Sequence, residues 1–81
     1  MPKSLRTPEQ RLLQRLLIEL RTSAHLTQAQ LAAKLERPQS FVAKYEIGER
    51  GIDVIEFCAI TRALEQEPTA VLARLVETAN L

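Results

Sequence analysis

The clearest structural signals of the chain lie in the stretch from LTQAQLAAKL, residues 26–35, to PQSFVAKYEIG, residues 38–48, which follows after two intervening residues. Thr27 with Gln30 three positions on has the pattern of a capping box, which marks the start of a helix. Pro38 stops that helix from continuing, and its fixed φ angle suits the first turn of another. Gly48 suits a left-handed residue after the second helix. Two short helices are therefore predicted, over residues 28–35 and 39–47.

The segment before this stretch has its own helix signals. Thr7 can cap a helix that begins at Pro8, with Gln10 completing a capping box. Five leucines recur at helical spacing in the following two turns and more, so that one face of the helix is apolar: Leu12, Leu13, Leu16, Leu17 and Leu20. The sequence predicts a helix over residues 8–22 that buries this stripe against the rest of the chain.

The segment after the stretch predicts two further helices. Asp53 with Glu56 forms a third capping-box pattern, and the residues that follow have a broad apolar surface. Pro68 then stands where a proline opens a helix that extends to about Ala79. Together these signals predict an all-α, compact five-helix fold, with no internal repeat.

Composition agrees with one helical domain spanning residues 1–81. Hydrophobic residues make up 46% of the 81 residues, which is enough for a single core. Residues 1–6 are expected to form a flexible N-terminal arm, and about 69–81 the last helix and a candidate dimerisation tail. The formal net charge is +1, which neither supports nor excludes a nucleic-acid partner. The N-terminus has no apolar signal core and no segment is long enough to span a membrane, so a cytoplasmic protein is expected.

The signals for chemistry are weak. The lone Cys58 lies in an apolar helical pattern, where we expect a buried structural thiol, and His25 is expected to be a solvated loop residue. We therefore predict no metal site and no cofactor. Neither a glycine-rich phosphate loop nor a serine-centred elbow occurs, so an enzyme is not expected.

The two central helices have the lengths and the short connection of a helix-turn-helix, from Thr27 to about Tyr45. Ala32 is small enough for close approach, and Val42 and Tyr45 are placed to face it from the second helix. The opposite face of the second helix then carries Gln39, Ser40, Ala43 and Lys44.

The motifs just quoted resemble the phage-repressor, Cro-like (XRE-type) helix-turn-helix family, through the Leu-Thr-Gln start, the Gln-Ser start of the second helix and the Tyr-Glu-x-Gly end. The resemblance covers roughly residues 9–76 and implies a lambda-repressor-like domain. It also implies a bacterial or phage setting in association with the nucleoid. Members of this family insert the second helix of the motif into the major groove and usually bind inverted repeats as dimers.

Carried over to this chain, the resemblance implies a set of DNA contacts. Gln28, and Thr27 beside it, would contact the DNA backbone at a phosphate. Gln28 could also brace Gln39. Gln39 would read an adenine, Ser40 either base, and Lys44 a guanine or a phosphate. Phe41 would either press against a thymine methyl or fill a gap beside the fourth helix. Arg37 and Arg50 would neutralise phosphates.

Solvated side chains remain the alternative for Gln39 and Lys44. Arg21 and Glu46 match positions that can form a structural ion pair, which would keep the negative charge of Glu46 away from phosphates. Glu36 and Glu65 stand where the family often has glycine. Either the backbone avoids positive φ at these positions, or each carries strain of about 1 kcal/mol.

The sequence leaves three functions open. The first is a transcriptional regulator, most simply a repressor, that binds double-stranded DNA as a homodimer through an apolar C-terminal face; its candidate residues are Leu72, Leu75, Val76 and Leu81. The alternative is a purely structural role, in which these residues only close the monomer's core. The second function is an antitoxin that neutralises a partner protein such as a toxin and represses its own operon. The third is a degenerate motif that serves as a structural adaptor.

Overall fold

The computed structural model describes residues 7–81. All of the regular secondary structure in this range is helical. The helices are α1 (Pro8–Ser23), α2 (Gln28–Leu35), α3 (Gln39–Glu46), α4 (Val54–Ala63) and α5 (Pro68–Ala79). The predicted all-α, five-helix fold is confirmed. The expected N-terminal arm, residues 1–6, lies outside the described residues.

The helix starts follow the local signals in the sequence. Thr27 accepts from the backbone N–H of Gln30, whose side chain accepts from the backbone N–H of Thr27. Asp53 and Glu56 form the same reciprocal pair at the start of α4. Thr7 accepts from the backbone N–H of Gln10 at the start of α1. Each pair satisfies donors that a helix N-terminus leaves unpaired, so these boundaries depend only on residues three apart.

After α2 and α4 the backbone adopts positive φ angles, a conformation that the sequence left open at these positions. Glu36 and Glu65 adopt left-handed conformations, with φ of 55° and 59°. The strained alternative therefore applies to both glutamates. Gly48 has a φ of 82°, as its place after α3 predicts. Pro38 lies just before α3, in an extended conformation, and α3 ends at Glu46, one residue earlier than expected.

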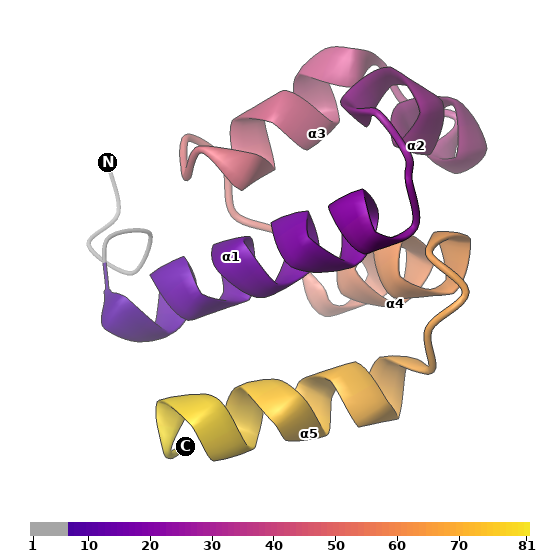
Figure 1. Ribbon diagram of the computed structural model, residues 1–81. Helices are drawn as coiled ribbons and strands as arrows, with labels where there is room; N and C mark the ends of the chain where they lie inside the picture. Colours follow the sequence, from indigo (N-terminus) through magenta and orange to yellow (C-terminus); the bar gives the residue numbers. More distant parts are fainter. Residues whose placement is uncertain (1–6) are drawn as a thin grey trace.

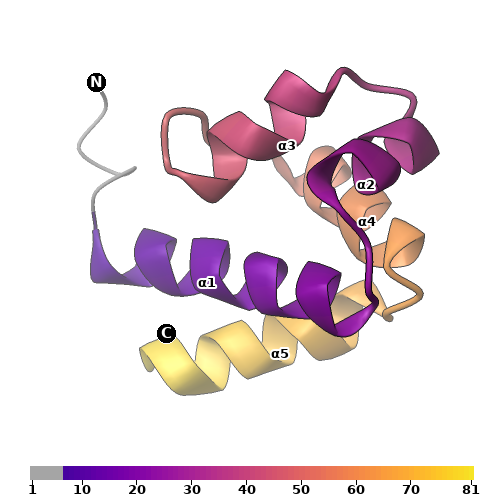
Figure 2. The ribbon, with the colours of Figure 1, turned by 45° about the horizontal axis from the view of Figure 1, so that its top comes forward.

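The core lies between the five helices, with α1 packed mainly against α3 and α5. It contains Leu17, Leu20, Leu31, Ala32, Phe41, Val42, Tyr45, Ile60, Leu64 and Val71. In two views of the ribbon, α2 and α3 lie on one side of α1, and α5 runs beside α1 on the other (Figures 1 and 2). The helix-turn-helix is therefore one end of the molecule, and α5 is the other. No helix within residues 7–81 is long and apolar enough to cross a membrane.

Candidate nucleic-acid interface

Close packing of α2 against α3 determines which side chains of α3 face outward. Leu31 and Ala32 of α2 are buried, as are Val42 and Tyr45 of α3. The small Ala32 lets the two helices approach each other. Gln39, Ser40 and Lys44 remain exposed on α3, and Ala43 is half-buried. Three polar side chains thus share the free face of α3, as in the pattern expected for a helix that reads bases.

A largely buried ion pair joins α1 to the end of α3. The Nε of Arg21 donates to one carboxylate oxygen of Glu46 at 2.7 Å, and its Nη2 donates to the other at 3.1 Å. Arg21 also donates to the carbonyl of Leu26 at 2.8 Å, which ties it to the chain just before α2. The hydrogen bond to Glu46 raises the pKa of Arg21, so the guanidinium stays charged. The negative charge of Glu46 is compensated inside the protein.

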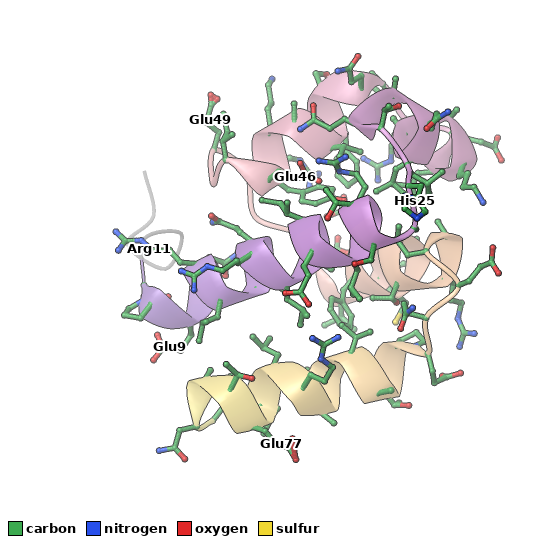
Figure 3. All side chains as sticks on the ribbon, in the orientation of Figure 1. Glu9, Arg11, His25, Glu46, Glu49 and Glu77 are labelled. Carbon is green, nitrogen blue, oxygen red and sulfur yellow. The ribbon has the colours of Figure 1, made fainter. Side chains whose placement is uncertain are left out.

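Gln28 lies between this ion pair and the outer face. Its Nε2 donates to Glu46 Oε1 at 2.8 Å, and its Oε1 accepts from Gln39 Nε2 at 3.5 Å, the long limit for a hydrogen bond. Figure 3 shows Glu46 directed toward α1 and α2, whereas Glu49, in the turn after α3, points away. The contact of Gln28 with Glu46 was not foreseen from the sequence, because the two residues are 18 positions apart.

Phe41 does not belong to the outer face, and its surroundings favour the core position over the thymine contact. Its side chain is only 7% exposed. The guanidinium carbons of Arg37 and Arg50 lie 4.4 and 4.8 Å from its ring centroid, and the ring of Tyr45 meets it edge-on at 5.4 Å. These cation–π and aromatic contacts hold the phenyl ring beside α4, which is the other position that the sequence had left open.

Arg37 and Arg50 share one carboxylate on α4. Arg37 donates to Glu56 at 3.1 Å, and Arg50 donates to both of its oxygens at 3.0 and 2.9 Å. The two arginine side chains remain 43% and 40% exposed, whereas that of Glu56 is 11% exposed. Hydrogen bonding, first from Arg50, then from the backbone of Asp53 and from Arg37, lowers the pKa of Glu56 to about 2. The cluster keeps an excess of positive charge that is accessible from solvent.

The remaining polar candidates are placed as follows. Thr27 is exposed at the N-terminus of α2, and Gln28 beside it is half-buried.

Burial raises the pKa of the Tyr45 hydroxyl, so that this side chain remains neutral in the core. His25 is exposed in the α1–α2 connection (Figure 3). Cys58 is half-buried, whereas a buried thiol was expected. Within residues 7–81 there is no cluster of three or more histidine, cysteine or acidic residues that could hold a metal ion.

Comparisons with known proteins agree with this geometry. The family model described as helix-turn-helix matches residues 17–71. A solved structure of an XRE-family like protein from Pseudomonas syringae pv. tomato str. DC3000 is 43% identical, with a TM-score of 0.86. The match covers 94% of this chain and 93% of that one. No curated protein matches significantly. With the family matched across most of the chain and the outer face of α3 left free, the protein belongs to the XRE-type helix-turn-helix family of DNA-binding transcription regulators.

Proposed function

We propose that this protein is a sequence-specific repressor that binds an inverted-repeat operator as a homodimer. The observation that carries the proposal is the exposed row of Gln39, Ser40 and Lys44 on α3, the helix that enters the major groove in such motifs. A dimer bound across a promoter excludes other proteins from the DNA that it covers. Repression therefore needs no surface beyond the DNA interface and the dimer contact.

Each polar residue of this face has a contact that suits its chemistry. The amide of Gln39 pairs with adenine, Ser40 donates to or accepts from a base edge, and Lys44 reaches a guanine or a phosphate. Thr27 and Gln28 stand at the positive end of α2, where backbone N–H groups favour a phosphate. Arg37 and Arg50, still partly exposed, add positive charge at the side of α3. Phe41 has no role in this scheme beyond support of α3.

The homodimer is proposed on apolar surface that the monomer's core leaves uncovered. Leu72, Val76 and Leu81 are 48%, 39% and 68% exposed, and Leu75 is half-buried. Leu72 and Leu75 also line an apolar groove of about 190 Å³ between α1, α4 and α5. Val54, 75% exposed, also lines this groove. Val71 and Pro68 already close the core from α5, so the remaining apolar residues favour an external partner.

A partner protein is the second candidate for this surface, and with it the function of an antitoxin that represses its own operon. The same exposed Leu72 and Leu81 favour it. The two candidates differ in whether the purified chain dimerises and in what truncation of its C-terminus abolishes first. A repressor that uses this face for itself dimerises without a partner. An antitoxin shortened after Glu77 loses its partner before it loses DNA.

Selection of bound sequences from a random duplex pool, followed by titration of variants, tests the main proposal. The enriched site is expected to contain two half-sites about one helical turn apart. Gln39→Ala should cost about 1–3 kcal/mol at one base pair of each half-site. Lys44→Ala should either relax one position or weaken all sequences and reduce the slope of log affinity against log salt by about one.

Matched variants away from α3 control for loss of an amide or a charge. Gln66→Ala and Lys34→Ala remove the same groups from exposed positions in the α4–α5 connection and on α2. Both should bind the enriched site nearly as the parent does. In cells, the parent should lower expression from a promoter that overlaps the site, and Gln39→Ala should not. Failure to enrich any sequence, or equal binding by Gln39→Ala, Lys44→Ala and their controls, would refute the proposal.

A further inference from the structure

We propose that Glu46 sets the base preference of Gln39 by fixing the orientation of the Gln28 amide between them, so that Gln39 selects adenine over guanine. The inference rests on the proposed function and adds a positioning role to a buried residue that does not touch DNA. Its basis is a continuous chain of hydrogen bonds from Arg21 to the outer face of α3.

The first link is a carboxylate that cannot turn. The side chain of Glu46 is 4% exposed, and both of its oxygens accept from Arg21. Arg21 is itself held by the carbonyl of Leu26. A guanidinium and a carboxylate in this two-bond arrangement define each other's plane. Glu46 Oε1 therefore stands at a fixed place beside the side chain of Gln28.

The second link is the choice between two orientations of an amide. An ionised carboxylate can only accept hydrogen bonds, whereas an amide has a donor side and an acceptor side. Gln28 must turn its NH₂ group toward Glu46, where the two atoms are 2.8 Å apart. The opposite orientation would place an amide oxygen against a carboxylate oxygen in a mostly buried site, with no donor between them. The oxygen of Gln28 consequently faces Gln39.

The third link determines what Gln39 can offer to a base. Its Nε2 lies 3.5 Å from the oxygen of Gln28, and so one N–H of Gln39 is engaged within the protein. One N–H and the amide oxygen remain for DNA, since Gln39 is exposed. Adenine presents one acceptor and one donor in the major groove, which match this pair. Guanine presents two acceptors there and would require both N–H groups.

A purely structural role for Glu46 makes a different prediction. If Glu46 only joins α1 to α3, its loss should lower stability and weaken binding to every sequence to the same degree. If it orients Gln28, its loss should specifically reduce the preference for adenine. The ratio of two affinities therefore separates the roles, because a uniform loss cancels from the ratio.

The experiment measures binding of each variant to the selected site and to the same duplex with guanine replacing adenine at the Gln39-dependent position. The parent chain should prefer adenine by about 5- to 150-fold, the range for a bidentate contact. Glu46→Gln should reduce this preference at least about fivefold, because Gln28 can then adopt either orientation. Gln28→Met removes the intervening amide, keeps the Arg21–Glu46 pair, and should reduce the preference similarly.

Two further variants complete the test. Glu49→Gln removes the same charge from an exposed position in the turn after α3 and should leave the preference unchanged. The double variant Glu46→Gln/Gln28→Met should lose no more preference than either single variant, since both act through one chain of contacts. If Glu46→Gln does not fold, as judged by circular dichroism, the base preference of Gln28→Met decides the question.

The outcomes distinguish this inference from the proposed function. A parent chain that enriches no sequence overturns both. A parent chain that enriches an operator, but retains its full preference for adenine in Gln28→Met and in folded Glu46→Gln, overturns only the positioning role. A preference for guanine at the Gln39-dependent position also overturns it, because the assigned amide orientation leaves one donor too few.

Discussion

Glu36 ends α2 in a left-handed conformation, with a φ of 55°. A Cβ atom makes this conformation unfavourable, whereas glycine adopts it freely. We expect Glu36→Gly to increase the free energy of unfolding by about 1 kcal/mol, as measured by urea denaturation. The side chain is exposed, so no buried contact is lost.

The control for this substitution is Glu36→Gln, which removes the charge but retains the Cβ atom and therefore the strain. Its unfolding free energy should stay close to that of the parent. Equal stabilisation by both variants would assign the effect to charge, and destabilisation by Glu36→Gly would show that the backbone strain is negligible. Glu65, with a φ of 59°, should respond to glycine in the same direction.

At the scale of elements, Glu56 joins the start of α4 to both ends of α3. It accepts from the backbone N–H of Asp53 just before α4, from Arg37 before α3, and from Arg50 after α3. The hydrogen bonds lower its pKa from the ordinary value of 4.5 to about 2. A carboxylate with a lower pKa in the folded state stabilises the fold fully above about pH 4.5, and this contribution is lost as the pH falls toward 2.

Replacement of this carboxylate should therefore have a pH-dependent cost. The parent should be more stable than Glu56→Gln at neutral pH, and the difference in unfolding free energy should shrink between about pH 4.5 and 2. Urea denaturation at a series of pH values measures it. Glu77→Gln, at an exposed position of α5, is the matched control and should show little difference at any pH. A constant difference for Glu56→Gln would contradict the assignment.

In the whole molecule, α3 carries the proposed DNA-reading residues and α5 the proposed dimer residues, and the two helices lie on different sides of α1 (Figure 1). Leu72 is central to the proposed dimer face, because it is 48% exposed and also lines the apolar groove. Leu72→Glu should shift the protein toward monomer in sedimentation experiments and leave its helical circular dichroism spectrum unchanged. Operator affinity should fall with it, since one half-site provides fewer contacts.

Ala73→Glu is the control for that prediction, because it adds the same charge to the neighbouring exposed position of α5. It should preserve the dimer. Since association favours the folded state, the melting temperature of the parent should also rise with protein concentration, and that of Leu72→Glu should not. A parent chain that remains monomeric at all concentrations would argue against the homodimer and in favour of a separate partner protein.

Local sequence patterns were sufficient to predict the helices, their starts and the outward-facing row on α3. The capping pairs at Thr27 and Asp53 join residues three positions apart, and such contacts form wherever the helix forms. The apolar spacing likewise follows from 3.6 residues per turn. These features were predictable because helical geometry alone relates the residues involved.

Local patterns could not predict what surrounds Phe41, which two arginines share Glu56, or where the Gln28 amide is held. These contacts join residues far apart in sequence, such as Arg37 with Glu56, 19 positions apart, and Gln28 with Glu46, 18 apart. Whether such side chains meet depends on the angles at which α1, α3 and α4 pack, and helical periodicity does not specify those angles. Phe41 could therefore be assigned to a helix from sequence, but its burial beside α4 required the packed structure.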